Sequence, residues 1–268
     1  MITRIGVETA WAGGLLIGLA LSVGSPQAIL GQTATRMTEA EAVAKLDSGD
    51  ASERDAAMRL VSELGPHAVR ELRMAMIRAA RAELDRPASE QRGEVALDYL
   101  FAVAKLRDAR AVPLLVESLV YGPFVAEALA GFGDLPLPLI LDLVSNPEKT
   151  VFDGVAEGLA TLRYMVEDGT LGPDGLAEVT VAVRQRLTTP QRWPSDINAA
   201  MGTAVALGDP ALLRIVERIA SDSVAARGIL GSSGEPSDLR RIQTEAQRLL
   251  DGGTPYPRRR PGKGAGGG

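Results

Sequence analysis

The side chains that most often carry chemistry are few in this chain. It contains one histidine, His67, and no cysteine, which excludes thiolate metal sites, a Cys–His pair and a metal site built from several histidines. His67 follows Gly65-Pro66, and we interpret it as a partly exposed residue at a helix start. The alternative is a general base or a pH switch. We predict no metal site and no cofactor.

The acidic and glycine-rich clusters give no stronger indication of a reaction. Glu94 and Asp98 are four residues apart, a spacing that places them together on the solvated face of a helix. Glu167-Asp168-Gly169 lacks the alternating acidic ligands and the terminal glutamate of a calcium loop. The segment 231–234, Gly-Ser-Ser-Gly, has no lysine after it and no strand before it, so it is not a phosphate loop. The sequence therefore predicts a protein without catalytic residues.

Composition and charge favour helices and argue against nucleic acid. Apolar residues make up 46 % of the 268 residues, but aromatic residues only 4 %, so alanine and leucine supply most of the core. The formal net charge is −5. Because residues 1–34 are neutral and the residues from Asp251 onward carry +3, the segment between them carries −8. An acidic body matches a phosphate backbone poorly, and we expect no nucleic-acid binding.

The first 34 residues differ from the rest. Arg4 precedes an apolar run at 10–23, and the small residues Gly24-Ser25 and Ala28 follow. A basic start, an apolar run of this length and a small-residue exit are typical of a secretory signal peptide, which predicts an exported protein, periplasmic or secreted. Two alternatives remain: an uncleaved membrane anchor over residues 5–23, and an ordinary core helix.

The last residues, 251–268, combine proline, glycine and an arginine triplet at 258–260. Proline and glycine oppose helix formation, and the segment has too few apolar residues to bury a core. We predict a disordered, solvated tail, with contact between the arginines and an anionic polymer or lipid as the alternative.

Between these ends, residues 35–250 read as helices separated by short breaks. Thr38 with Glu41, and Asp50 with Glu53, have the spacing of a capping box. Proline is expected just inside three helix starts, and glycine at five breaks. The prolines are Pro147, Pro210 and Pro236, and the breaks are Gly65-Pro66, Gly122-Pro123, Gly133-Asp134, Gly172-Pro173 and Gly208-Asp209. No segment is long enough to bury its apolar stripe alone, so neighbours must cover it.

The helical units are similar to one another. The segment 126–134 ends in Phe-Gly-Asp as 202–209 ends in Leu-Gly-Asp, and a second helix follows each, at 135–143 and 210–219. Leu106-Arg107-Asp108 followed by 111–119 repeats the pattern, and 64–72 is a fainter copy.

This pattern resembles the HEAT repeat family in its short bacterial form, with Ala111-Val112-Pro113-Leu114 as its closest single match. The resemblance covers about residues 50–219. It implies an all-α fold, a right-handed α-solenoid of about five helical hairpins whose second helices line a concave face that holds other proteins. The stretch 150–190 is longer than a family unit.

The repeat alignment selects the candidate partner-binding residues. Glu117, Asp142 and Glu217 occupy equivalent positions near the ends of three second helices, where they would form an acidic ladder that attracts a basic partner. The alternative is three ordinary surface acids. Trp193 lies before a helix, either as an exposed binding anchor or as a residue covering the end of a neighbouring helix pair.

We therefore predict an exported, non-catalytic scaffold that binds a protein or peptide on its concave face. A regulatory or binding subunit held at the membrane by residues 5–23 is the first alternative. A HEAT-like-fold enzyme is the second, since that fold includes DNA-base glycosylases and bilin lyases, although the acidic body opposes a DNA substrate.

Overall fold

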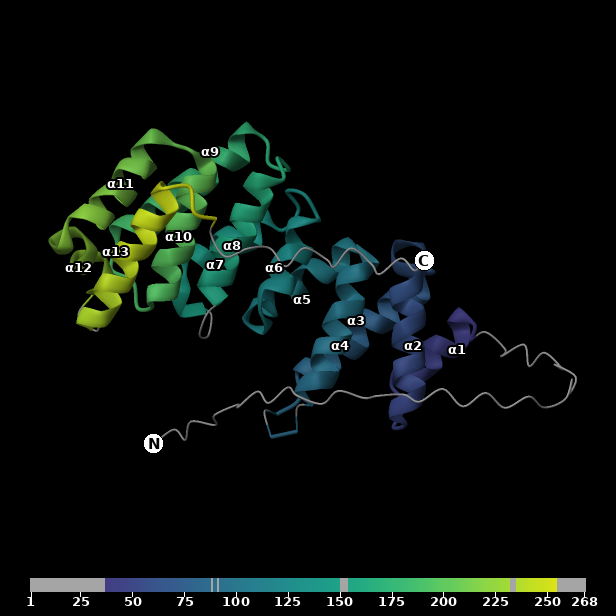
Figure 1. Ribbon diagram of the computed structural model, residues 1–268. Helices are drawn as coiled ribbons and strands as arrows, with labels where there is room; N and C mark the ends of the chain where they lie inside the picture. Colours follow the sequence, from purple (N-terminus) through teal and green to yellow (C-terminus); the bar gives the residue numbers. More distant parts are fainter. Residues whose placement is uncertain (1–36, 88, 91, 150–153, 232–234, 255–268) are drawn as a thin grey trace, which may run out of the picture. The chain divides into compact units, whose positions relative to one another are not determined.

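The computed structural model describes residues 37–87, 89–90, 92–149, 154–231 and 235–254 (Figure 1). Within these ranges every regular element is helical and no strand occurs, which confirms the predicted all-α class. The predictions for residues 1–34 and for most of the tail lie outside the described residues. The α-helices are α1 (Glu39–Lys45), α2 (Ala51–Leu64), α3 (Arg70–Leu84), α4 (Gly93–Leu106), α5 (Val112–Glu117), α6 (Pro123–Ala130), α7 (Leu137–Ser145), α8 (Gly154–Glu167), α9 (Pro173–Thr188), α10 (Pro194–Leu207), α11 (Pro210–Ser221), α12 (Ser223–Leu230) and α13 (Pro236–Leu250).

Four short 3-10 helices connect them: η1 (Gly65–His67), η2 (Ala109–Ala111), η3 (Leu119–Tyr121) and η4 (Pro147–Lys149). Pro147 therefore begins a 3-10 turn rather than the predicted α-helix. Its fixed φ suits the first position of either kind of helix. The predicted proline starts at Pro210 and Pro236 are confirmed.

The first of the two predicted capping boxes is confirmed and the second forms only in half. Thr38 accepts a hydrogen bond from the Glu41 N–H at 3.2 Å, and Glu41 accepts one from the Thr38 N–H at 2.8 Å. Asp50 likewise accepts from the Ser52 N–H at 2.8 Å. Glu53, however, accepts from the Ser48 hydroxyl at 2.7 Å instead of returning to the backbone of Asp50, because Ser48 lies in the turn directly in front of it.

Four aligned unit ends share a positive φ. Gly65, Arg107, Gly133 and Gly208, which the sequence alignment places at the same point of successive units, have φ of 53°, 51°, 68° and 65°. Such left-handed values close a helix without cost for glycine but strain other residues. Arg107 is the one non-glycine residue with positive φ in the described ranges. Arg107 and Gly208 are both left-handed helical, with ψ of 33° and 14°, whereas Gly65 has ψ of −126°. The left-handed helix end therefore recurs at Arg107 even though the residue type changes.

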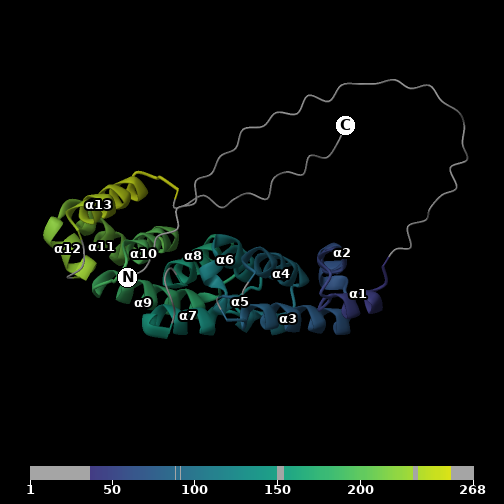
Figure 2. The same ribbon diagram turned by 90° about the horizontal axis from the view of Figure 1, so that it is seen from below.

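The helices pack mostly against near neighbours in the sequence. The even-numbered helices α2, α4, α6, α8 and α10 each contact the next even helix, and the odd helices α7, α9, α11 and α13 contact one another in the same way. In Figure 2, α2, α4, α6 and α8 form one row and α3, α5 and α7 another. A single buried cluster, rich in alanine and leucine, runs between them from Ala42 to Leu249.

Small and hydroxyl side chains let α8 approach its neighbours closely. A Cβ added at Gly158 would lie 3.1 Å from methyl carbons of both Leu143 and Val144 on α7. The buried Thr203 hydroxyl of α10 donates to the Leu159 carbonyl oxygen of α8 at 2.9 Å. Among the described residues, no helix combines the length and the apolar character needed to cross a bilayer.

Candidate functional site

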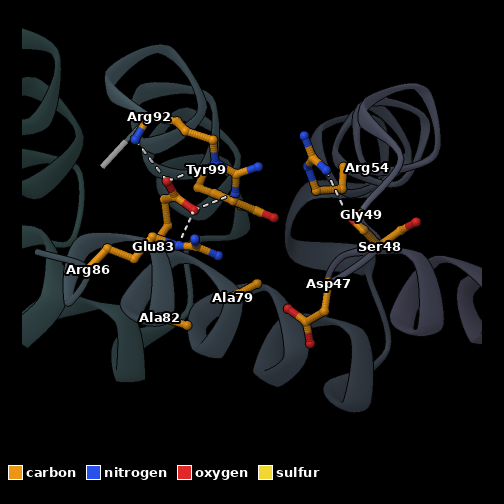
Figure 3. A pocket seen from close by; sticks show the side chains of 10 residues that line it. All are labelled: Asp47, Ser48, Gly49, Arg54, Ala79, Ala82, Glu83, Arg86, Arg92 and Tyr99. Atoms are coloured by element: carbon orange, nitrogen blue, oxygen red, sulfur yellow. Dashed lines mark hydrogen bonds and ion pairs between the residues drawn. The ribbon is translucent and has the colours of Figure 1, made fainter. Parts of the chain in front are cut away.

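A pocket of about 170 Å³ lies where the turn after α1 faces the end of α3 and the start of α4. In Figure 3, Ser48, Gly49 and Arg54 lie on one side of it, and Glu83, Arg86, Arg92 and Tyr99 on the other. The remaining lining residues are Asp47, Ala79 and Ala82. Most of the polar groups that line it are charged, so the pocket is suited to an ionic ligand.

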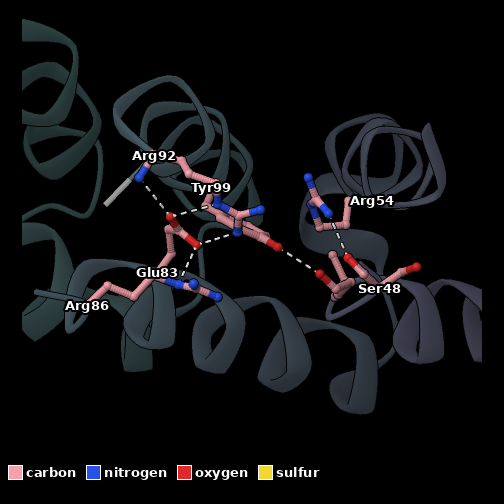
Figure 4. A network of polar contacts seen from close by, with 7 residues as sticks. Ser48, Arg54, Glu83, Arg86, Arg92 and Tyr99 are labelled. Atoms are coloured by element: carbon pink, nitrogen blue, oxygen red, sulfur yellow. Dashed lines mark hydrogen bonds and ion pairs between the residues drawn. The ribbon is translucent and has the colours of Figure 1, made fainter. Parts of the chain in front are cut away.

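Glu83 is the centre of the polar network on the α3–α4 side (Figure 4). It lies in the last turn of α3 with 2 % of its surface exposed. The Arg92 side chain donates to Oε1 at 3.2 Å and to Oε2 at 2.5 Å, and the Arg92 backbone N–H donates to Oε1 at 3.1 Å. Arg86 lies 3.0 Å from Oε2. A carboxylate at a helix C-terminus opposes the helix dipole, and these two cations offset that repulsion.

The network changes the ionisation of its members. The side-chain hydrogen bonds from Arg92 hold the pKa of Glu83 below its usual value, against the opposing effect of burial. The same hydrogen bonds raise the pKa of Arg92. Burial raises the pKa of the Tyr99 hydroxyl, which donates to the Leu46 carbonyl oxygen at 2.7 Å. Glu83 is therefore ionised and Tyr99 neutral at neutral pH.

Arg54 forms the opposite side of the pocket. It lies in the first turn of α2 with 7 % of its surface exposed, and its Nη1 donates to the Ser48 carbonyl oxygen at 2.7 Å. Its Nε is buried and has no hydrogen-bond partner among the described residues. Buried polar groups in proteins are nearly always hydrogen-bonded, so the incompletely bonded Arg54 guanidinium, which lines the pocket, is a candidate ligand contact.

The three residues of the predicted acidic ladder have different surroundings. Glu117 ends α5 and forms a two-pronged ion pair with Arg81 of α3, whose second hydrogen bond measures 3.1 Å. Asp142 on α7 is exposed and accepts a hydrogen bond from the Asn146 side chain at 2.7 Å. Glu217 is exposed on α11, and α9 packs between α7 and α11. The three residues occupy one row of helices, but Glu117 is neutralised by Arg81.

Trp193 is half-buried at the N-cap of α10. The guanidinium of Arg192 lies 5.0 Å from the centre of its ring, a cation–π contact. Gln191, two residues before Trp193, is 2 % exposed, and its backbone N–H donates to the Ile229 carbonyl oxygen of α12 at 2.6 Å. The segment between α9 and α10 that carries Trp193 is therefore bonded to α12.

The other residues considered for chemistry lie apart from the pocket or have structural partners. His67 is exposed in η1. Glu167 accepts a hydrogen bond from Arg163, four residues earlier on α8, at 3.1 Å. Asp98 is exposed on α4, and its pKa is raised by partial burial and by the nearby charges of Asp55 and Glu94.

A second buried ion pair joins α9 to α10. Arg186 and Asp196 lie 4.0 Å apart with side chains 8 % and 4 % exposed. Burial lowers the pKa of Arg186, against the opposing effect of Asp196 and Glu148. We interpret this pair as structural, because it joins two adjacent helices.

Sequence reasoning missed the pocket, since its charged residues lie in separate parts of the sequence. Arg54 is 29 residues before Glu83, and Arg92 is nine residues after it. One signal was available: arginines at 86 and 92 follow a helix end that carries Glu83. Arginine next to an acidic C-terminal turn is typical of a neutralised carboxylate.

Within the described part of the chain, no group of three or more histidine or acidic side chains is arranged to hold a metal ion. Comparison of the chain with protein-family models, with curated proteins and with solved structures finds no match.

Proposed function

We propose that residues 37–250 form a right-handed α-solenoid of about five HEAT-like hairpins and serve as a non-catalytic scaffold for a protein or peptide. The observation that carries the proposal is the order of the helix contacts. Helices pack against the next helix and the next but one, as α6 does against α8 and α7 against α9. In repeat proteins each unit contacts its neighbours in this way, which produces an extended binding surface.

The repeated turn supports the same proposal. Asp108 and Asp209, which follow the left-handed residues Arg107 and Gly208, both accept hydrogen bonds from N–H groups of the next helical segment. The distances are 3.1 Å to the Arg110 N–H and 2.9 Å to the Ala211 N–H. Two units with the same turn and the same cap are expected if the chain repeats one structural design.

The row of odd-numbered helices is the face that we assign to the partner. Asp142 and Glu217 present exposed carboxylates on α7 and α11. Opposite charge steers the encounter of two proteins, so a basic segment is the complementary partner. Glu117 on α5 lies in the same row and forms an ion pair with Arg81 of α3.

Site-specific photo-crosslinking in the native cells tests the scaffold function. We expect a photoreactive residue at Asp142 or Glu217 to capture one common protein. The same residue at Arg59 or Lys105, exposed on the even helices α2 and α4, should not capture it. Equal capture from all four positions, or none from any, would contradict the assignment of the face. A substrate turned over by the purified chain, and lost on changing one carboxylate, would replace the scaffold with the enzyme alternative.

We also propose that the scaffold is exported. The apolar run at 10–23 supports this, as does the basic residue before it. Mass spectrometry of the native protein distinguishes a cleaved signal peptide from an uncleaved membrane anchor. A mature chain that begins after residue 23 indicates a cleaved signal, whereas an intact N-terminus in the membrane fraction indicates the anchored regulatory subunit.

A further inference from the structure

The pocket beside Arg54 contains one more positive charge than its own carboxylates balance. Three guanidinium groups line it, those of Arg54, Arg86 and Arg92, together with the carboxylates of Glu83 and Asp47. Glu83 already binds both Arg86 and Arg92. No carboxylate of the described residues lies within ion-pair distance of Arg54. The lining therefore has a net charge of +1, and Arg54 is its most buried cation.

Part of the Arg54 guanidinium is hydrogen-bonded within the fold, and part of it has no partner among the described residues. Its hydrogen bond to the Ser48 carbonyl oxygen uses Nη1 and fixes the plane of the guanidinium. Nε is buried without a hydrogen-bond partner among the described residues, and the Arg54 side chain lines the pocket. Burying an ionised group with few hydrogen bonds is costly, and an anion bound beside the guanidinium would offset part of this cost.

The charge and the available donors select a carboxylate over a phosphate. A single negative charge balances the lining, while a phosphate with its charge of nearly −2 would leave an excess beside Asp47. The Tyr99 hydroxyl already gives its proton to Leu46 and adds no donor. A planar guanidinium binds a planar carboxylate through two parallel hydrogen bonds. The volume of about 170 Å³ admits such a group with a short aliphatic chain.

We propose that this pocket is a binding site for a carboxylate group, carried by a small organic acid or by the C-terminus of a peptide, and that Arg54 is its main ligand contact. The site is independent of the scaffold function. It would be occupied by a small acid whether or not the helices also bind a partner protein.

The test is a titration of the full chain, labelled with ¹⁵N-arginine, in which the Nε–H resonances are followed by NMR. Sodium acetate is the first probe, at ionic strength held constant with sodium chloride. We expect the Arg54 Nε–H resonance to move and reach saturation. A response no larger than that to chloride alone, in acetate and in every probe below, would overturn the proposal without any need for a variant.

Two further probes identify the source and the chemistry. A tetrapeptide with a free C-terminus is compared with the same peptide amidated at that end. Binding of the free peptide well above acetate assigns the site to peptide C-termini, while binding of acetate alone assigns it to small acids. Inorganic phosphate should bind more weakly than acetate at neutral pH. Tighter phosphate binding would overturn the choice of a carboxylate.

Two matched variants assign the contact. Arg54→Lys keeps the charge but removes Nε and the planar fork, and we expect acetate binding to weaken about tenfold or more. Arg59→Lys makes the same change at an exposed position of the same helix and should leave acetate binding unchanged. Circular dichroism confirms that both variants are folded. Equal acetate affinity in Arg54→Lys and the wild type would show that Arg54 is not the ligand contact.

Discussion

The guanidinium of Arg107 lies on the backbone of Gly131, where Nη1 donates a hydrogen bond to the Gly131 carbonyl oxygen at 2.6 Å. A Cβ at position 131 would fall 1.8 Å from this nitrogen. The contact joins the end of α4 to the end of α6. Arg107 holds it from a left-handed backbone conformation with φ of 51° that favours glycine. Arg107 thus has a strained backbone conformation, and its side chain forms a hydrogen bond to the next helix pair.

The first prediction concerns this pair. Gly131→Ala should destabilise the wild type by up to about 1 kcal/mol, because the new methyl group displaces Arg107 and breaks its hydrogen bond. In an Arg107→Ala background the same change should cost nothing, since Gly131 has helical φ of −71°. Urea unfolding of the four proteins in a double-mutant cycle measures the difference. Equal losses in both backgrounds would show that the contact is not formed.

The second prediction separates two glycines that both face open space. Gly208 has φ of 65°, and Gly208→Ala should destabilise the chain by about 1–2 kcal/mol. Gly228 lies within α12 with no left-handed φ, and Gly228→Ala should stabilise it by about 0.5–1 kcal/mol. Thermal unfolding of the two variants should give shifts of opposite sign. Shifts of the same sign would contradict the backbone assignment.

The third prediction is that Glu83 supports stability only while it is ionised. Glu83→Gln removes the carboxylate from a buried ionic network and should lower the unfolding free energy by about 2 kcal/mol at pH 7. The loss is smaller than for a fully buried ion pair because Arg86 and Arg92 are partly exposed. The pKa of Glu83 is lower in the folded than in the unfolded state. Its contribution is therefore complete above the unfolded value of about 4.5 and is lost as the pH falls through the lower folded value.

Chemical denaturation of Glu83→Gln and wild type between pH 7 and pH 3 checks this. The difference in unfolding free energy should shrink as the pH falls. Glu71→Gln, at an exposed position of the same helix, is the control and should show little effect at any pH. A difference for Glu83→Gln that stays constant with pH would mean that packing, not charge, explains the loss.

The fourth prediction is that Asp98, unlike Glu83, lowers stability when it is ionised. Partial burial and the charges of Asp55 and Glu94 raise the pKa of Asp98, so its ionised form opposes folding. Asp98→Asn should raise the unfolding free energy at neutral pH by less than about 1 kcal/mol, because Asp98 is exposed. This gain should disappear as the pH falls below about 4, where the wild-type side chain is protonated. Denaturant titrations at pH 7 and pH 3 give the comparison.

The fifth prediction tests the proposed solenoid. Ile242 is buried on α13, and Ile242→Ala should weaken that helix by about 2–4 kcal/mol through the cavity it leaves. In a repeat array the loss should speed hydrogen exchange in α13 and in its contacts α10, α11 and α12. Amides of α1 to α4 should keep their protection. Faster exchange throughout the described helices would indicate one cooperative bundle instead.

The helices and their ends were predictable because the signals are local. Thr38 with Glu41, and Asp209 with Pro210, satisfy N–H groups within the same turn, so a window of a few residues contains the whole interaction. The turn at Arg107 was found by alignment with glycine breaks even though arginine disfavours its conformation. The repeat alignment therefore indicated a helix end at Arg107 that the conformational preference of arginine alone would not predict.

The pocket and the fate of Glu117 were not predictable, because both depend on packing between distant segments. The partner of Glu117 is Arg81, 36 residues away, and nothing in either local sequence indicates that α3 and α5 present these groups to each other. The pocket lined by Arg54 likewise brings together residues from the turn after α1, from α3 and from α4. The alignment showed which positions are equivalent but not which opposite charges face them.

The hydrogen bond between Arg107 and Gly131 also has a mechanical consequence. A hydrogen bond keeps its strength over a narrow range of length and angle, while apolar contacts between small side chains allow some sliding. The boundary between α4 and α6 is therefore stiffer than one formed by apolar contacts alone. When the helix array flexes, the boundaries joined by a hydrogen bond, this one and that between α8 and α10, should move less than boundaries formed by apolar contacts alone.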